Sequence, residues 1–170
     1  MKVLVDTSVW SLAFRRKQTS NAEPPPSGMT IASPVADETT ANGGIVETLS
    51  ELIADSLIVL VGPIRQELLS GISDATVYDN LKSRLRSYDD LPITTADYEK
   101  AAAFYNTCRK HGVQGSHVDF LLCAIAYNHD LLLFTTDHDF LHYAKHLPIR
   151  LLRVQEPDSR RQVLYDDTEQ

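Results

Sequence analysis

The sequence has no long apolar run, few cysteines and little positive charge. Its 170 residues include two cysteines, seven glycines and one tryptophan. Apolar runs such as residues 131–134 are far shorter than the roughly 20 residues that span a bilayer. No charged segment followed by an apolar one opens the chain, so we expect no secretory signal and no membrane association. Two cysteines make no disulfide framework, which favours a reducing compartment and a cytoplasmic protein.

The shortage of positive charge narrows the possible partners. Sixteen Lys and Arg stand against 23 Asp and Glu, for a formal net charge of −7 with His neutral. Phosphate affinity comes mainly from clustered Lys and Arg, so this balance argues against an extended nucleic-acid-binding face. No glycine-rich phosphate loop is present, which argues against a nucleotide-binding enzyme. The hydrophobic content of 43% suffices for one folded domain of ordinary size.

Short apolar segments alternate with amphipathic ones along the chain. The strand-like segments lie at 2–5, 57–61, 131–135 and 148–154. The helix-like segments lie around 9–14, 45–54, 63–72, 77–88, 97–108, 120–129 and 140–144. This alternation predicts an α/β fold in which helices cover both faces of a mainly parallel sheet.

Two of the expected helices begin with a capping-box spacing. Thr94 stands three residues before Asp97, and Ser116 stands three residues before Asp119. In a capping box the first side chain accepts from the backbone N–H of the second residue, whose own side chain accepts from the first residue's N–H. The helix that follows Ser116 is nearly all apolar over residues 120–129, so we expect it at the centre of the fold.

Residues 18–44 differ in composition from the rest of the chain. They hold four of the eight prolines and three of the seven glycines, and they show no apolar period. This composition predicts a long loop or insertion. Polar residues dominate from Gln155 onward, which predicts a loose tail. We therefore expect one domain over residues 1–154, with an insertion at about 18–44 and a polar tail over 155–170.

Four acidic residues fall near the ends of the expected strands. Asp6 follows the first strand and Asp137 the third, whereas Glu67 lies in the helix after the second strand and Asp119 opens the apolar helix. The carboxyl ends of parallel strands meet at one edge, where such sheets bind ligands. Two carboxylates about 5 Å apart repel by roughly 3 kcal/mol at an effective dielectric near 20. A cluster there requires a proton or a cation, and Mg²⁺ and Mn²⁺ prefer carboxylate oxygens.

Each of these acids also has an ordinary structural explanation. Asp119 can complete the capping box of Ser116, and Glu67 can be a solvated acid on a helix face. Asp137 can be a turn residue, because Asp is common after strands. Asp6 is harder to explain in this way, since a charged group rarely follows a buried strand without a role. The joint placement of the four acids is what favours a functional site.

Four segments stand out in order along the chain: VLVDTSVW at 3–10, IRQELLSG at 64–71, SHVDFLLCAIA at 116–126 and LFTTDHDF at 133–140. Together they resemble segments of PIN-domain nucleases, and most closely of the VapC-type toxins of toxin–antitoxin pairs. The resemblance covers about residues 1–17 and 45–154. It implies a three-layer α/β/α sandwich and an endoribonuclease that depends on Mg²⁺ or Mn²⁺ and hydrolyses RNA with metal-activated water.

The resemblance also implies roles for individual residues. The acidic, metal-binding and catalytic quartet corresponds by position to Asp6, Glu67, Asp119 and Asp137. The residues that would support this quartet are Thr7, Ser8, Ser116 and Asp139.

The same resemblance implies partners. Proteins of this type usually form homodimers and are inhibited by a small antitoxin protein whose C-terminal segment enters the site. RNA is the implied substrate, with tRNA favoured. The dense basic run of Arg15, Arg16 and Lys17 lies near the end of the first expected helix. It can contact phosphate or simply be a solvated helix face.

Other interpretations of the residues stay open. A phosphohydrolase could use Asp6 as a nucleophile, although that class commonly has a second Asp where Ser8 stands. A non-catalytic interaction module would use the acids only as helix caps and surface charges. A zinc site with His117 and His138 is a further alternative, but no HxxxH or Cys–His spacing supports it.

Overall fold

Four short parallel strands form the centre of the molecule. The computed structural model describes residues 1–19 and 36–154, and within these it leaves out the side chains of 15–19 and 36–42. The strands pair in the order β2-β1-β3-β4, and each pairing is parallel. Their bounds are β1 Val3–Val5, β2 Ile58–Val59, β3 Leu132–Phe134 and β4 Arg150–Leu151. The predicted parallel sheet is confirmed.

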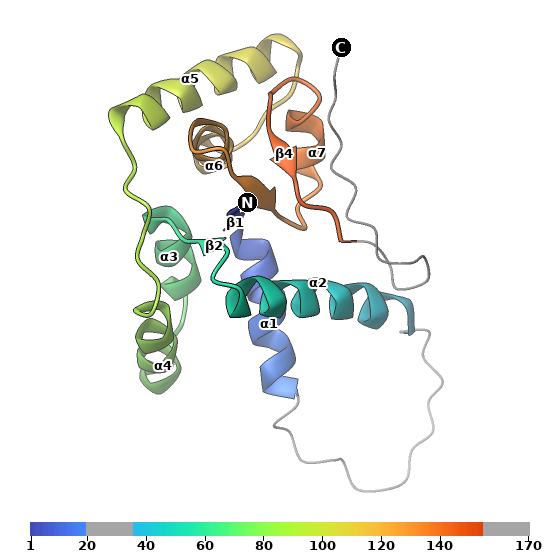
Figure 1. Cartoon of the computed structure of the whole chain (residues 1–170), viewed down its shortest axis with the longest axis vertical. Coiled ribbons are helices and arrows are strands. Elements are labelled where there is room, and N and C mark those ends of the chain that lie inside the picture. Colours follow the sequence, from blue (N-terminus) through green and yellow to red (C-terminus); the bar gives the residue numbers. More distant parts are fainter. Residues whose placement is uncertain (20–35, 155–170) are drawn as a thin grey trace, which may run out of the picture.

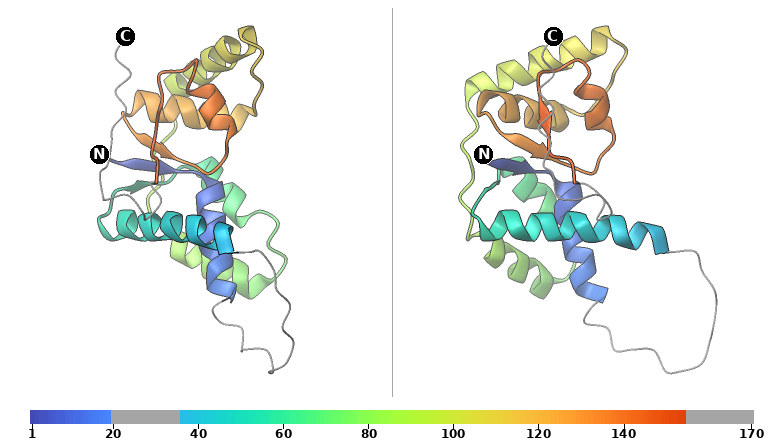
Figure 2. Two further views of the ribbon diagram at one scale, coloured as in Figure 1. Left: turned by 90° about the vertical axis from the view of Figure 1, so that its right-hand side faces the viewer. Right: turned by 45° about the vertical axis from the view of Figure 1, so that its right-hand side comes forward.

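Helices cover both faces of this sheet. Their bounds are α1 Thr7–Thr19, α2 Ala36–Ala54, α3 Gly62–Leu69, α4 Ala75–Leu85, α5 Thr95–Lys110, α6 His117–Asn128 and α7 Asp139–Tyr143. Figures 1 and 2 show α5 and α6 on one side of the strands, and α1 and α2 on the other. The three-layer α/β/α arrangement is therefore confirmed. Among the described residues, none of the helices combines the length and apolar character needed to cross a bilayer.

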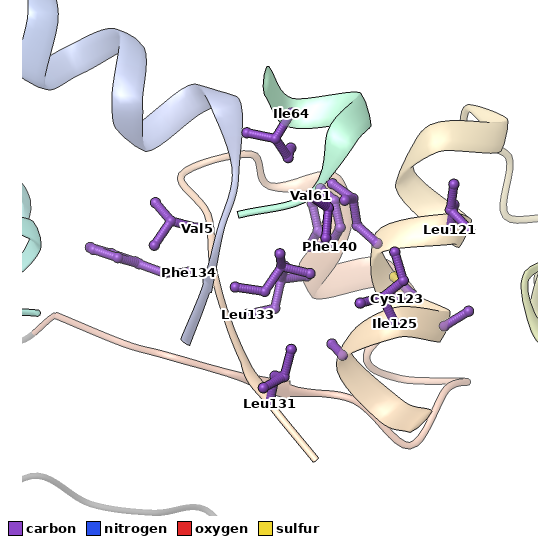
Figure 3. Packing of buried hydrophobic residues seen from close by; sticks show 14 of the residues in the cluster. Val5, Val61, Ile64, Leu121, Cys123, Ile125, Leu131, Leu133, Phe134 and Phe140 are labelled. Atoms are coloured by element: carbon purple, nitrogen blue, oxygen red, sulfur yellow. The ribbon is translucent and has the colours of Figure 1, made fainter. Parts of the chain in front are cut away.

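The core lies between the central strands and α6. β1 and β3 are buried along their whole length, as expected for parallel strands covered on both faces. All seven residues from Phe120 to Ala126 are buried in α6, which confirms its predicted central place. Figure 3 shows Leu133 on the side of the strands that faces α6, and Val5 with Phe134 on the opposite side. Burying each of these large side chains contributes about 2 kcal/mol.

Both predicted capping boxes are present. The Thr94 hydroxyl accepts from the Asp97 N–H at 3.4 Å, and the Asp97 carboxylate accepts from the Thr94 N–H at 2.8 Å. In α6 the corresponding distances between Ser116 and Asp119 are 3.0 and 2.9 Å. The capping box of α6 places the Asp119 carboxylate in the first turn of the central helix, next to the end of the sheet.

The prediction of a loop over 18–44 is wrong at both ends. α1 continues to Thr19, and α2 begins at Ala36 rather than at Ile45. An apolar period is therefore not required for this part of α2 to be helical. The remaining residues of that segment, 20–35, and the predicted tail at 155–170 lie outside the described residues.

Two strands are shorter than predicted. Hydrogen-bonded pairing in β2 and β4 covers two residues each, whereas the apolar runs extend over 57–61 and 148–154. Leu60 continues β2 only as an isolated bridge to Asp90. An apolar run reports burial, and its flanking apolar residues, such as Leu57, Leu60 and Leu152, are buried or half-buried without being part of β2 or β4.

Candidate active site

Asp6 lies directly after β1, at the carboxyl end of the central strand. Its N–H donates to the Phe134 carbonyl at 2.9 Å, which extends the β1–β3 pairing by one residue. Its side chain is 9% exposed. One carboxylate oxygen, Oδ2, accepts from the Ser8 hydroxyl at 2.7 Å and from the Thr135 hydroxyl at 2.9 Å. These donors come from α1 and from the residue after β3, so both central strands orient Asp6.

Glu67 reaches the same region from α3. Pro63 stands in the first turn of this helix, and Ile64 and Leu68 anchor it in the core. Glu67 lies on the exposed side, and its Oε2 accepts from the Thr7 hydroxyl at 2.9 Å. Thr7, the first residue of α1, therefore anchors the carboxylate of Glu67 in α3.

Asp119 caps α6 and also lies at the candidate site. Its Oδ2 completes the capping box by accepting from the Ser116 N–H, and it also accepts from the buried Tyr143 hydroxyl at 3.3 Å. The same half-buried side chain lines the pocket described below. The pKa of the Tyr143 phenol is raised mainly by burial and secondly by the negative charge of Asp119. This hydroxyl therefore stays protonated and donates.

Asp137 is held by a turn that follows β3. Its N–H donates to the Thr135 hydroxyl at 3.0 Å, and its Oδ1 accepts from the Asp139 N–H at 2.9 Å. Asp137 is exposed and lines the pocket, whereas Asp139 begins α7 and acts on it through the backbone. The turn role that the sequence suggested for Asp137 is thus compatible with a place in the site.

One cavity of about 340 Å³ brings the four acids together. Asp6, Glu67, Asp119 and Asp137 all line it, and so do Thr7 and Ser8. The apolar part of the lining comes from α1, α6 and α7, through Leu12, Val118, Leu122 and Phe140. Segments that are up to 131 residues apart in the sequence therefore share one cavity, as the strand-end argument predicted.

The four carboxylates share a pattern of anchoring. Each uses one oxygen to accept hydrogen bonds: Oδ2 of Asp6, Oε2 of Glu67, Oδ2 of Asp119 and Oδ1 of Asp137. Within the described residues the second oxygen of each acid has no hydrogen-bond donor. The donors are all neutral hydroxyl or amide groups. None of the ion pairs found in the described part of the chain includes these acids.

The donor chemistry of this pocket suits a hard divalent cation. Carboxylate oxygens without a protein partner are the ligands that Mg²⁺ and Mn²⁺ prefer. In the described ranges, 1–19 and 36–154, no group of three or more His, Cys, Asp or Glu side chains stands ready to hold a metal ion. The four acids therefore line one cavity without converging on one point.

Other residues singled out in the sequence lie elsewhere. His117 stacks on Tyr105 with ring centroids 5.1 Å apart, and neither His117 nor His138 lines the pocket. The zinc alternative gains no support from this arrangement. The side chains of Arg15, Arg16 and Lys17 lie outside the part of the chain that the structure describes.

Two hydroxyl groups at the site were not found from the sequence. Thr135 follows β3 and joins Asp6 to the backbone of Asp137, so the strand-end argument that found Asp6 could have found it. Tyr143 lies on the apolar face of α7 and has the pattern of a core residue. No sequence signal separates Tyr143 from an ordinary buried aromatic.

Comparison with known proteins assigns the family. The family model described as PIN domain matches residues 44–146, more than half of the chain. This chain belongs to the PIN-domain family. PIN domains are generally nucleases, so family membership supports a hydrolase that cleaves nucleic acid. No curated protein sequence gives a significant match.

Solved structures share the fold of this PIN domain. FitAcB from Neisseria gonorrhoeae is 19% identical, with a TM-score of 0.60 and coverage of 88% of this chain and 95% of that one. VapBC2 from Rickettsia felis, bound to a DNA fragment from its promoter, is 13% identical, with a TM-score of 0.62 and coverage of 90% and 98%. VapBC-1 from nontypeable Haemophilus influenzae is 12% identical, with a TM-score of 0.55 and coverage of 89% and 96%. At these identities the likeness concerns the fold.

Proposed function

We propose that this PIN domain is an endoribonuclease that depends on Mg²⁺ or Mn²⁺ and acts as the toxin of a toxin–antitoxin pair. The observation that carries the proposal is one cavity lined by four acids. Each acid is anchored through one oxygen, and its other oxygen has no donor among the described residues. Acids with a purely structural role in helix caps and turns also accept hydrogen bonds through one oxygen. Such roles do not explain why acids from four separate segments line the same cavity.

Asp6, Glu67, Asp119 and Asp137 would hold the ion, and binding requires the exposed side chains of Glu67 and Asp137 to move toward the buried Asp6. The bound ion supplies Lewis acidity for the attack of water on a phosphodiester. The hydrogen bonds of Ser8 and Thr135 orient Asp6 before an ion arrives. Such pre-orientation lowers the reorganisation that binding costs.

An antitoxin partner, a homodimer and a cytoplasmic location are part of the proposal. The neighbours FitAB and VapBC2 are described as bound to DNA, and in VapBC2 the DNA is a promoter fragment. We propose RNA as the substrate of this chain, with tRNA tested first. The phosphohydrolase alternative gains nothing from the site, because Ser8 stands where that class commonly has its second acid and hydrogen-bonds Asp6 instead.

The proposal is tested with purified protein freed of metal by chelation. We expect Mn²⁺ or Mg²⁺ to raise the melting temperature and to permit RNA cleavage, because an ion that binds only the folded state stabilises it by mass action. Asp6→Asn and Asp119→Asn should each remove both responses. Asp79→Asn is the matched control, since Asp79 is an exposed acid of α4 outside the pocket, and it should retain both.

Cleavage by the Asp6→Asn, Asp119→Asn double variant at the wild-type rate would contradict the assignment. Mapping the cut sites on total cellular RNA after brief induction then identifies the substrate. Cuts confined to tRNA would support the favoured class, and cuts in rRNA or mRNA would replace it. The oligomeric state is read from light scattering during gel filtration, with a mass near 38 kDa expected for two copies of the 19.0 kDa chain.

A further inference from the structure

Tyr143 is a buried phenol next to the candidate site. It ends α7, has no exposed surface, and packs on Phe120 and Phe140 with ring centroids 4.9 and 5.3 Å away. Its hydroxyl is directed at two acceptors, Oδ2 of Asp119 at 3.3 Å and the Gln114 carbonyl at 3.4 Å. A phenol has one proton to donate, and an ionised carboxylate is a stronger acceptor than a carbonyl. The contact with Asp119 therefore dominates.

Gly115 gives this hydroxyl its space. A Cβ atom at position 115 would overlap the Tyr143 hydroxyl and would lie 2.7 Å from Cζ of the same ring. A side chain of any size there has to displace the phenol. Gly115 precedes the Ser116 cap, and Tyr143 is the last residue of α7. Because Gly115 has no side chain, the Tyr143 hydroxyl can approach Asp119.

The Ser116 N–H and the Tyr143 hydroxyl occupy the same oxygen of Asp119. The capping-box bond alone leaves the carboxylate able to rotate about it, whereas a second donor from a different helix fixes the plane of the group. With Oδ2 held twice, Oδ1 is the oxygen left for a ligand in the cavity. Groups that orient a metal-binding residue in this way typically change metal affinity or activity by 10- to 100-fold when removed.

We propose that Tyr143 is a positioning residue that holds Asp119 through Oδ2 and so sets the affinity of the pocket for a divalent cation. This inference rests on the proposed function of the same pocket. It goes beyond that function by assigning a role to a core aromatic that touches neither the cavity nor the substrate.

The test is calorimetric titration of Mn²⁺ into metal-free Tyr143→Phe. This change removes only the hydroxyl and keeps the ring that packs on Phe120. We expect the Kd for Mn²⁺ to rise about tenfold. In RNA cleavage, the half-saturating Mn²⁺ concentration should rise by the same factor, while the rate at saturating Mn²⁺ stays within about twofold of wild type. A purely structural role would lower the melting temperature and leave both metal parameters unchanged.

Tyr105→Phe is the matched control. Tyr105 packs edge-on against the same Phe120 at 5.4 Å, and its hydroxyl is not among the donors to the four carboxylates in the described residues. It should bind Mn²⁺ as wild type does. Gly115→Ala is a second variant that tests the same contact. It keeps the Tyr143 hydroxyl but displaces it from Asp119, so it should weaken Mn²⁺ binding. It serves as the test if Tyr143→Phe does not fold.

The outcomes separate the two proposals. Wild-type Mn²⁺ affinity in folded Tyr143→Phe, together with loss of binding in Asp119→Asn, would overturn the role of Tyr143 and leave the nuclease assignment standing. Tighter binding in Tyr143→Phe would also overturn it, because the hydroxyl would then compete with the ion for Asp119. Absence of Mn²⁺ binding and of cleavage in the wild-type protein would overturn the proposed function and this inference with it.

Discussion

Asp97 allows the pH dependence of stability to be worked out from the structure. It lies in the first turn of α5, has no exposed surface, and accepts from the Thr94 N–H and hydroxyl at 2.8 Å each. Two groups at the far end of α6 reach it as well: the Asn128 amide at 2.9 Å, and His129 Nε2 at 3.3 Å from one carboxylate oxygen and 3.4 Å from the other. Asp97 thus joins the start of α5 to the end of α6, the helix that carries Asp119.

The magnitude follows from the pKa of Asp97. Burial acts to raise this pKa, but the hydrogen bonds from Thr94, Asn128 and His129 outweigh it and lower the pKa from 3.8 to about 2. A shift of that size is worth about 2 kcal/mol of stability when the carboxylate is ionised. Because the folded-state pKa lies below the unfolded one, this stability is fully present above pH 3.8 and is lost as the pH falls toward 2.

We therefore expect Asp97→Asn to lower the free energy of unfolding by about 2 kcal/mol at pH 7, or the melting temperature by about 4–8 °C. The assay is urea unfolding of both proteins from pH 7 down to pH 2, and the difference between them should shrink below pH 4. Asp74→Asn is the matched control, because Asp74 caps α4 with one exposed bond to the Val77 N–H and Asn caps equally well. A difference between Asp97→Asn and wild type that is the same at pH 7 and pH 3, or absent at pH 7, would refute this reasoning.

Two further predictions concern the site. Thr135→Val keeps the shape of the side chain but removes the donor to Asp6 and the acceptor of the Asp137 N–H. The rate of RNA cleavage should therefore fall about 10- to 100-fold. The control is Thr76→Val, on the exposed surface of α4, which should leave the cleavage rate unchanged. Asp137→Asn keeps an acceptor for the Asp139 N–H while removing one negative charge from the pocket. This change relieves about 1 kcal/mol of repulsion, so it should raise the melting temperature in chelator by about 2–4 °C. It should also abolish stabilisation by Mn²⁺. A lower melting temperature in chelator would show that repulsion is not the dominant effect.

The elements and the placement of the acids were predictable because they depend on local patterns. The apolar run at residues 131–135 and the nearly apolar segment at 120–129 each have one stable place in an α/β fold. Ser116 and Asp119 form their capping box from a spacing that is visible in the sequence. The shared cavity of the four acids follows from the rule that parallel strands end at one edge.

The rest depended on contacts between distant segments. The approach of Tyr143 to Asp119 requires α7 to return over α6 and requires no side chain at Gly115, and neither condition is written in a local pattern. The early start of α2 at Ala36 has no local signal, because residues 36–44 show no apolar period and include two threonines and two glycines, which are weak helix formers. Thr135 also follows a strand, but it is uncharged, so the repulsion argument that singles out a cluster of acids does not apply to it.

The anchoring of the acids gives a physical reason for the excess of negative charge. Hydroxyl and amide donors orient each carboxylate but leave its charge unbalanced, whereas a Lys or Arg partner would offset the repulsion and occupy the oxygens. Within the described residues, cations pair with other acids, such as Arg65 with Asp90 at 2.9 Å and Arg150 with Asp130. No Lys or Arg of the described residues offsets the charge of the four acids, so their mutual repulsion opposes folding, and a bound cation would relieve it. A cation that enters both relieves the repulsion and takes the open oxygens, so it should bind and stabilise the fold in one step.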